Sequence, residues 1–208
     1  MSLIDNFEQI KKLLTFSKDK EYFYFCQIIV RRKDLDDQST MSSNNIVIRT
    51  IYIDSLEKFN REEKIIKNIC KETQGRAYIN IAPKSYKLLT KQMLKLLTDR
   101  ICNEDYISPQ KISDSAAGMI KSFQPVWLVD IDDKDYKILN LCTDIIDNKC
   151  EPFDNIQNSK IIDVIETKNG CHLLTKPFNL NKFQEECKKA GLLMPDVHKN
   201  NPTILYIN

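Results

Sequence analysis

The sequence predicts a mixed α/β protein built from two consecutive modules that form a single unit. Short apolar, β-rich runs alternate along the chain with segments of helical periodicity. An Asn-Gly pair at 169–170 separates two such runs, which is typical of a β-hairpin. The 208 residues are enough to bury a full core. We place an N-terminal α/β module at residues 1–122 and a second module at 123–208.

The first module is predicted to contain three strands with helices between and after them. Apolar residues at helical spacing predict a helix over 3–17, and YFYFCQIIV predicts a strand over 22–30. We interpret Tyr22, Phe23 and Tyr24 as core side chains of that strand. A polar loop at 31–45 leads to a strand at 46–53 and a helix at 54–71. A strand at 76–82 and helices at 83–102 and 109–121 complete the module.

Two basic features of this module could contact phosphates. Lysines recur at helical spacing opposite leucines, which favours the solvated face of an amphipathic helix (Lys84, Lys87, Lys91 and Lys95). Arg31, Arg32 and Lys33 end a predicted strand, but three aspartates follow them at 34, 36 and 37. Both features therefore fit phosphate contacts and ordinary solvated surface.

The second module shows the order β-α-β-β-α-β. The strand PVWLVDID at 125–132 leads to a helix at 134–147, and strands at 160–167 and 171–176 flank the Asn-Gly turn. A helix at 179–190 and the strand TILYIN at 203–208 close the chain. This order is that of the ferredoxin-like unit, in which the first strand lies beside the second hairpin strand. Asp130, Asp132 and His172 are therefore predicted to share one face of a sheet.

The aspartates at the end of WLVDID have an ordinary structural explanation as well. Asp132, Asp133 or Asp135 could cap the helix that begins near Lys134, since aspartate is a favoured N-cap residue. That role explains one aspartate better than it explains the pair Asp130 and Asp132. Residues two apart on a strand lie on one face at a spacing of ~7 Å, so these two carboxylates would repel unless a cation or solvent lies between them.

Composition limits the classes of function. The net charge is +2, so nucleic-acid binding would need a local basic patch. The seven cysteines are scattered without a CxxC pair, which argues against a zinc ribbon or a disulfide framework. No apolar run is long enough to span a bilayer, and the N-terminus lacks the apolar region of a signal peptide. We expect a cytoplasmic protein without a membrane partner.

The two motifs together resemble the archaeo-eukaryotic primase, or primase–polymerase, superfamily. WLVDID matches its first motif, an apolar strand ending in D-x-D, at Asp130 and Asp132. Gly170-Cys171-His172 matches its second, a small residue, any residue and histidine. The resemblance implies an RRM-like palm with Mg²⁺ or Mn²⁺ at the aspartates and the phosphates of a nucleoside triphosphate at His172. The implied reaction is metal-assisted nucleotidyl transfer, with DNA or RNA as a partner and a role in replication.

The sequence departs from that family at the third motif, which is an acidic residue on a later strand. The last strand ends in Asn208, an amide where a carboxylate is expected, and Asp196 is the alternative third metal ligand. Around such a site, Lys168, Lys176 and Lys199 are candidates for binding the triphosphate. The short chain suggests a minimal member of the superfamily, of phage or mobile-element origin. A catalytically degenerate palm that binds nucleotide, nucleic acid or a partner protein is the alternative.

A second alternative uses the same stretch of chain. Glu166-Thr167-Lys168 is an E-x-K pattern at the end of an apolar strand, which resembles the PD-(D/E)xK nucleases. In that class an acidic residue binds metal and the lysine helps to activate water. Lys168 lies on the predicted turn, which favours a solvated rim instead. This hypothesis requires Glu166 and Lys168 to meet at one site.

Overall fold

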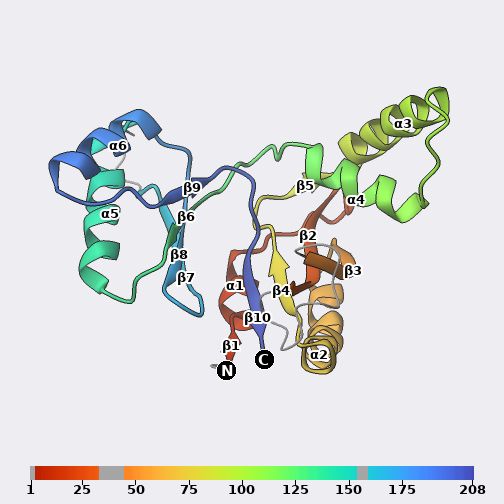
Figure 1. The fold of residues 1–208 in the computed structure, drawn as a ribbon, viewed down its shortest axis with the longest axis horizontal. Helices are drawn as coiled ribbons and strands as arrows, with labels where there is room; N and C mark the ends of the chain where they lie inside the picture. Colours follow the sequence, from red (N-terminus) through yellow and green to blue (C-terminus); the bar gives the residue numbers. More distant parts are fainter. Residues whose placement is uncertain (1–2, 33–44, 154–158) are drawn as a thin grey trace.

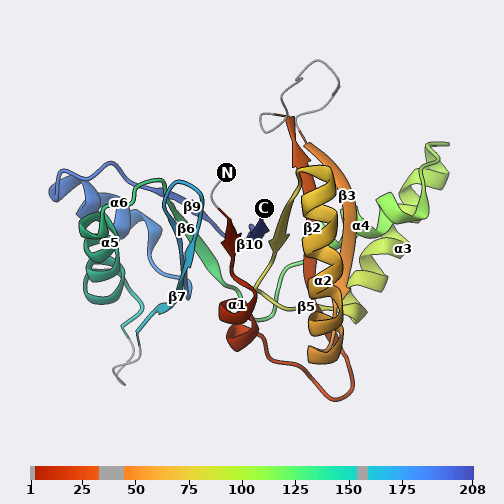
Figure 2. The same cartoon turned by 90° about the horizontal axis from the view of Figure 1, so that it is seen from below.

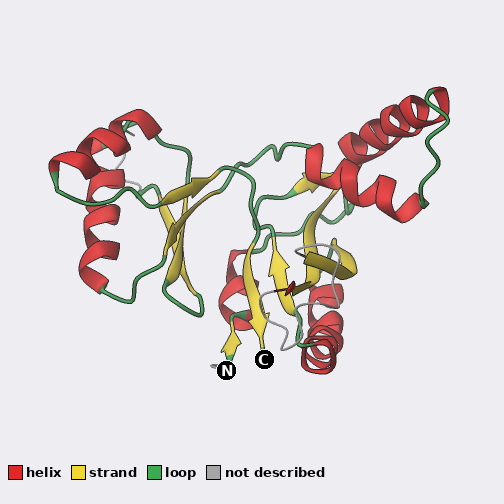
Figure 3. Cartoon of the chain, viewed as in Figure 1, coloured by secondary structure: helices red, strands yellow, loops and turns green. Residues whose placement is uncertain are grey.

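The computed structural model describes residues 3–32, 45–153 and 159–208. The strands in these ranges form two antiparallel sheets, one of six strands and one of four (Figure 1). The helices α5 and α6 lie at one end of the long axis and α3 and α4 at the other, with strands between them (Figure 3). The predicted mixed α/β class is confirmed.

The six-stranded sheet belongs mainly to the N-terminal part of the chain. Its order is β1-β10-β4-β2-β3, and β5 pairs with β2 off this path. The strands are β1 (Ile4–Asp5), β2 (Tyr22–Arg31), β3 (Asn45–Ile53), β4 (Arg76–Ile79), β5 (Lys84–Ser85) and β10 (Thr203–Ile207). The helices of this part are α1 (Phe7–Leu13), α2 (Leu56–Thr73), α3 (Tyr86–Cys102) and α4 (Pro109–Met119).

The four-stranded sheet belongs to the second module, and we use the name palm module for this sheet with α5 and α6 as a label of position only. Its order is β7-β8-β6-β9, and its strands are β6 (Trp127–Ile131), β7 (Ile161–Glu166), β8 (Cys171–Thr175) and β9 (Asp196–His198). Helices α5 (Tyr136–Lys149) and α6 (Leu180–Lys189) lie on its side away from the first sheet (Figure 2). The order of elements from β6 to β9 is the predicted ferredoxin-like one, with β6 next to β8.

Successive side chains of β6 point to opposite faces of the palm sheet, and both faces pack against other parts of the protein. Val129 and Ile131 are buried in a cluster with side chains of α5 and α6. Leu128 points the other way and joins the largest core cluster, which includes Ile79 and Leu205 of the first sheet. Successive strand residues face opposite sides, so Asp130 lies on the Leu128 face. The site residues therefore face the first sheet.

The predicted place of the last strand was wrong. The strand at 203–207 pairs with β1 and β4 in the first sheet, while β9, which was not predicted, closes the palm. All five residues of β10 are buried, which suits a strand flanked on both sides. The three residues of β9 include the exposed Asp196, which suits an edge. Asn208 consequently follows a strand of the first sheet, and the boundary at 122/123 does not separate the modules completely.

Several smaller predictions were also corrected. The predicted helix 3–17 is the short strand β1 followed by α1. The helix expected from Pro83 begins at Tyr86, because Lys84 pairs with Phe23 of β2 before the chain turns. Lys84 is only 1% exposed and its Nζ donates to the Ala117 carbonyl at 2.5 Å, so it is not part of a solvated stripe. Of the loop predicted at 31–45, residues 33–44 lie outside the described ranges.

Two further predictions concern apolar segments. Phe23 and Tyr24 are buried, and the half-buried Tyr22 packs against the core cluster that contains Tyr24, which confirms the interpretation of this stretch of β2 as core. Within the ranges that the structure describes, no helix is long and apolar enough to cross a bilayer.

Candidate functional site

A cavity of about 530 Å³ lies between the two sheets, and it contains both predicted motifs. This volume is in the range of small-molecule sites, which run from ~300 to ~1,000 Å³. The palm contributes Leu128, Asp130, Asp132, Thr167, Lys168, Asn169, His172 and His198 to the lining. The first sheet and the segment leading into β10 contribute Arg31, Arg76, Tyr78, Asn201, Pro202, Ile204 and Ile207.

Strand pairing places Asp130 at the centre of the palm sheet. It lies directly opposite His172 on β8 and opposite Asp196 on β9. Asp132 follows β6 by one residue and lines the same cavity. The sequence thus correctly predicted that Asp130, Asp132 and His172 share a face, and the unpredicted β9 adds Asp196 beside them. Asn208 lines a separate cavity with Lys71 and Gln74 and is not the equivalent of a third acid in the palm.

The helix-capping explanation accounts for other aspartates. Asp135 is the N-cap of α5, and its side chain accepts a hydrogen bond from the Lys137 amide at 2.9 Å. Asp133 accepts from the Asp135 amide at 2.8 Å. These two residues satisfy the start of the helix, as capping predicts. Asp130 and Asp132 are therefore left without a capping role.

The Asp130 carboxylate is in an unfavourable electrostatic setting. Its burial raises the pKa of the carboxyl, and the charges of Asp132 and Asp196 raise that pKa further. The nearby His198 lowers the pKa of Asp130 in opposition to these effects. In the described part of the chain no lysine or arginine forms an ion pair with Asp130, and the His172 ring lies 3.6 Å from it. A half-buried carboxylate with other acidic groups close to it is one that an added cation would stabilise.

The His172 imidazole is buried against this carboxylate. Its Nε2 lies 3.6 Å from Asp130 Oδ1, and its Nδ1 lies 2.8 Å from the Thr203 hydroxyl. Burial and, to a smaller extent, the nearby His198 together lower the pKa of His172 to about 4, against an opposing effect of Asp132. The two side chains are thus at ion-pair distance without forming a salt bridge at neutral pH, because the ring is uncharged.

Gly170 explains why a small residue precedes His172 by two positions. A Cβ atom built on Gly170 would lie 1.9 Å from the Ile131 carbonyl oxygen and 2.7 Å from the Asp133 amide nitrogen. The turn is closed by the Gly170 amide donating to Thr167 Oγ1 and the Thr167 amide donating to the Gly170 carbonyl. The turn thus packs directly on the backbone that ends β6, which brings β8 into register with the aspartates.

The carboxylates fit a divalent ion that brings other ligands with it. Within the described ranges, no three His, Cys, Asp or Glu side chains converge into a complete metal site. Mg²⁺ in nucleotide enzymes commonly takes one or two protein carboxylates and completes its shell with phosphates and water. Asp130 and Asp132 can supply those two carboxylates. Asp196 is exposed and is in register with Asp130, although it does not line the cavity.

The lysines predicted to bind a triphosphate are placed differently from one another. Lys168 lines the cavity, on the turn where it was predicted. Lys176 is exposed and follows the opposite end of β8 from His172. Lys199 is exposed, and its Nζ lies 4.9 Å from the centroid of the Trp127 ring at the start of β6. The structure does not bring Lys176 or Lys199 into the cavity.

The cationic side of the cavity comes mostly from the first sheet. Arg31 at the end of β2 and Arg76 at the start of β4 face it, and an Arg31 Nη1 lies 3.5 Å from the Tyr78 hydroxyl. Arg31 was noted in the sequence as a phosphate contact or a surface residue, and Arg76 was not noted at all. A single arginine at the start of a short strand carries no local signal, because the sequence does not show which other sheet it will face.

The E-x-K residues do not meet at one site. Lys168 lines the cavity between the sheets, whereas Glu166 lines a second cavity of about 640 Å³ with Asp5, Gln9 and Asp133. A PD-(D/E)xK nuclease needs the acidic residue and the lysine around one metal and one water. The geometry therefore gives the nuclease hypothesis no support.

No known family, curated protein or solved structure matches this chain.

Proposed function

We propose that the cavity between the two sheets binds a nucleoside triphosphate with Mg²⁺ or Mn²⁺, and that the protein is a nucleotidyltransferase of the primase–polymerase type. The observation that carries the proposal is the register of the palm sheet. It sets Asp130 between His172 and Asp196, with Asp132 in the same cavity. Arginines from the other sheet line the same space.

The chain's own residues divide the cavity by charge. Asp130 and Asp132 would hold the metal, which when bound supplies electrostatic stabilisation for an in-line displacement at phosphorus. Arg31, Arg76 and Lys168 line the cavity with side chains suited to phosphate oxygens. Neutral His172 lines the same cavity next to Asp130 and would be an uncharged hydrogen-bonding partner for a phosphate oxygen.

One observation favours a second candidate function, a palm that binds nucleotide without turnover. Asp196 is in register with Asp130, yet its exposed side chain does not line the cavity. A polymerising site with two metals needs more carboxylate than Asp130 and Asp132 provide. A protein that only binds nucleotide, nucleic acid or a partner protein would not need the Asp196 carboxylate inside the cavity.

Calorimetric titration of ATP and dATP in Mn²⁺ tests the site. Asp130→Ala and His172→Ala should each weaken metal-dependent binding, by more than ~100-fold for the aspartate. Asp144→Ala on α5 is the matched control, because that carboxylate lies on the outer surface beside Lys149. No binding by folded wild-type protein would refute the proposal. Binding without primer extension, under conditions where Asp130→Ala does not bind, would favour the second candidate.

A further inference from the structure

Thr203 makes a contact that joins the two sheets at the candidate site. It is the first residue of β10, which belongs to the six-stranded sheet, and it is 1% exposed. Its hydroxyl oxygen lies 2.8 Å from Nδ1 of His172, a residue of the palm sheet that is 31 positions away in sequence. The imidazole is thus held from one side by the first sheet and faces Asp130 on the other.

The two neutral forms of His172 differ in what they present to Asp130. If Nδ1 carries the hydrogen, it donates to Thr203 Oγ1 and the Nε2 lone pair faces the carboxylate oxygen at 3.6 Å. If Nε2 carries the hydrogen, the Thr203 hydroxyl donates to Nδ1 and an N–H dipole faces the carboxylate. The second arrangement is attractive and the first repulsive, because a lone pair and a carboxylate are both negative.

We infer that Thr203 is a positioning residue that holds His172 in the form with its hydrogen on Nε2. The threonine hydroxyl occupies Nδ1 as a donor, so Nε2 offers an N–H to the cavity. The use of that N–H for a phosphate oxygen rests on the proposed function, whereas the position of the hydrogen does not. A histidine with its lone pair toward the cavity would repel phosphate oxygens, so the Thr203 hydroxyl, together with Asp130, favours the form of His172 that can help to bind an anion.

Nitrogen NMR of ¹⁵N-labelled protein tests the position of the hydrogen. The chain has only two histidines, so His198→Gln assigns the His172 signals. Wild type should show a hydrogen on Nε2 and a hydrogen-bonded, unprotonated Nδ1. Thr203→Val, which keeps the side-chain shape, should add a fraction of the form with its hydrogen on Nδ1, because Asp130 alone then favours a hydrogen on Nε2. Thr203→Ser should restore the wild-type pattern. A hydrogen on Nδ1 in wild type, or an unchanged pattern in Thr203→Val, would overturn the inference.

Titration of ATP with Mn²⁺ adds the functional readout. Thr203→Val should weaken binding by about 10-fold and Thr203→Ser should recover most of the loss, since outer-shell partners typically contribute this much. Equal affinity of the valine variant and wild type would overturn the claim that Thr203 serves binding. Absence of binding in wild type would instead refute the proposed function, and the NMR pattern would still decide the form of His172.

Discussion

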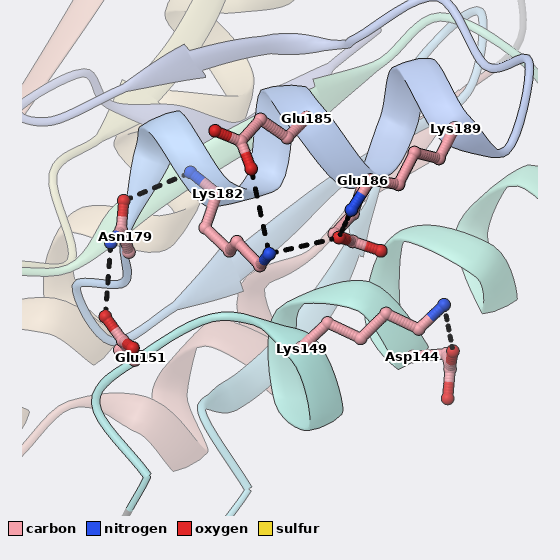
Figure 4. Close-up of polar contacts among 8 residues, drawn as sticks. All are labelled: Asp144, Lys149, Glu151, Asn179, Lys182, Glu185, Glu186 and Lys189. Atoms are coloured by element: carbon pink, nitrogen blue, oxygen red, sulfur yellow. Dashed lines mark hydrogen bonds and ion pairs between the residues drawn. The ribbon is translucent and has the colours of Figure 1, made fainter.

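Two groups of acidic side chains lie on opposite sides of the palm module, and their surroundings shift their pKa values in opposite directions. On α6, Glu186 forms ion pairs with Lys189 at 2.6 Å and with Lys182 at 3.2 Å (Figure 4). Lys182 also forms an ion pair with Glu185. These lysines, Lys189 first, lower the pKa of Glu186. On the inner face of the sheet, burial and neighbouring acids raise the pKa of Asp130.

The difference separates a solvated surface from a candidate binding site. Ion pairs on the outer side of a helix contribute little to stability, so the main effect of Lys182 and Lys189 is to neutralise the Glu186 carboxylate. Nothing comparable neutralises Asp130 among the residues that the structure describes. A half-buried carboxylate that destabilises the free protein is typical of a group kept for a ligand.

The largest expected effect is at Gly170, which holds the inner site together. Gly170→Ala should lower the free energy of unfolding by more than ~3 kcal/mol, because the new Cβ would overlap the Ile131 carbonyl oxygen and the turn would have to move off β6. Urea unfolding measures the change. Gly118→Ala in α4 is the control, since its Cβ would meet nothing within 4 Å, and it should be neutral or stabilising. Equal stabilities of the two variants would contradict the close approach.

Lys84 extends the comparison to a buried charge of the opposite sign. Burial lowers the pKa of Lys84 from 10.5 to about 8. Below pH 8 both folded and unfolded chains hold the proton, and the folded state bears the full cost of the buried charge. Between pH 8 and 10.5 the unfolded chain binds more protons, so this group adds stability as pH rises, up to about 3 kcal/mol.

Unfolding of wild type and Lys84→Met from pH 7 to 10.5 isolates this contribution. The free energy of unfolding of wild type should rise relative to that of Lys84→Met as pH rises. Other titrating groups are the same in both proteins and cancel in this difference. Lys87→Met, on the exposed side of α3, should run parallel to wild type. A constant difference between wild type and Lys84→Met would show that Lys84 keeps its usual pKa.

Asp130 itself should show the cost of an unpaired carboxylate. Asp130→Asn should raise the Tm of the metal-free protein by about 2 °C, because it removes a charge that burial and Asp132 disfavour. The same substitution should abolish the metal-dependent binding described above. Thermal unfolding in a chelator, followed by circular dichroism, gives the Tm. A lower Tm of Asp130→Asn would mean that the Asp130 carboxylate stabilises the folded protein, which would contradict this prediction.

The smallest effect is expected on α6. Glu186→Gln should change the Tm by less than about 2 °C, and any loss should shrink in high salt, because surface ion pairs are screened. Scans at low and at high NaCl provide the measurement. A large decrease in Tm that does not depend on salt would show that Glu186 is not part of a weak surface ion pair, which would contradict the proposed difference between Glu186 and Asp130.

The sequence by itself determined the parts of this protein that depend on local signals. Alternating apolar runs located the strands around WLVDID and CHLLT, and Asn-Gly located the turn between β7 and β8. The ferredoxin-like order then predicted that Asp130, Asp132 and His172 share one face, and the structure adds that Asp130 lies directly opposite His172. These predictions succeeded because strand periodicity, turn chemistry and the order of elements are properties of neighbouring residues.

Only the tertiary structure decided which strand closes each sheet and what faces the aspartates. The run at 203–207 and the short stretch at 196–198 both follow α6, and either could have paired with β6 on sequence grounds. Burial of β10 on both sides places it in the first sheet, which leaves Asp196 beside Asp130 and Thr203 against His172. Arg31 and Arg76 reach the cavity by the same packing. Pairing between distant strands is decided by the burial it achieves across the whole molecule, and a local pattern does not contain that information.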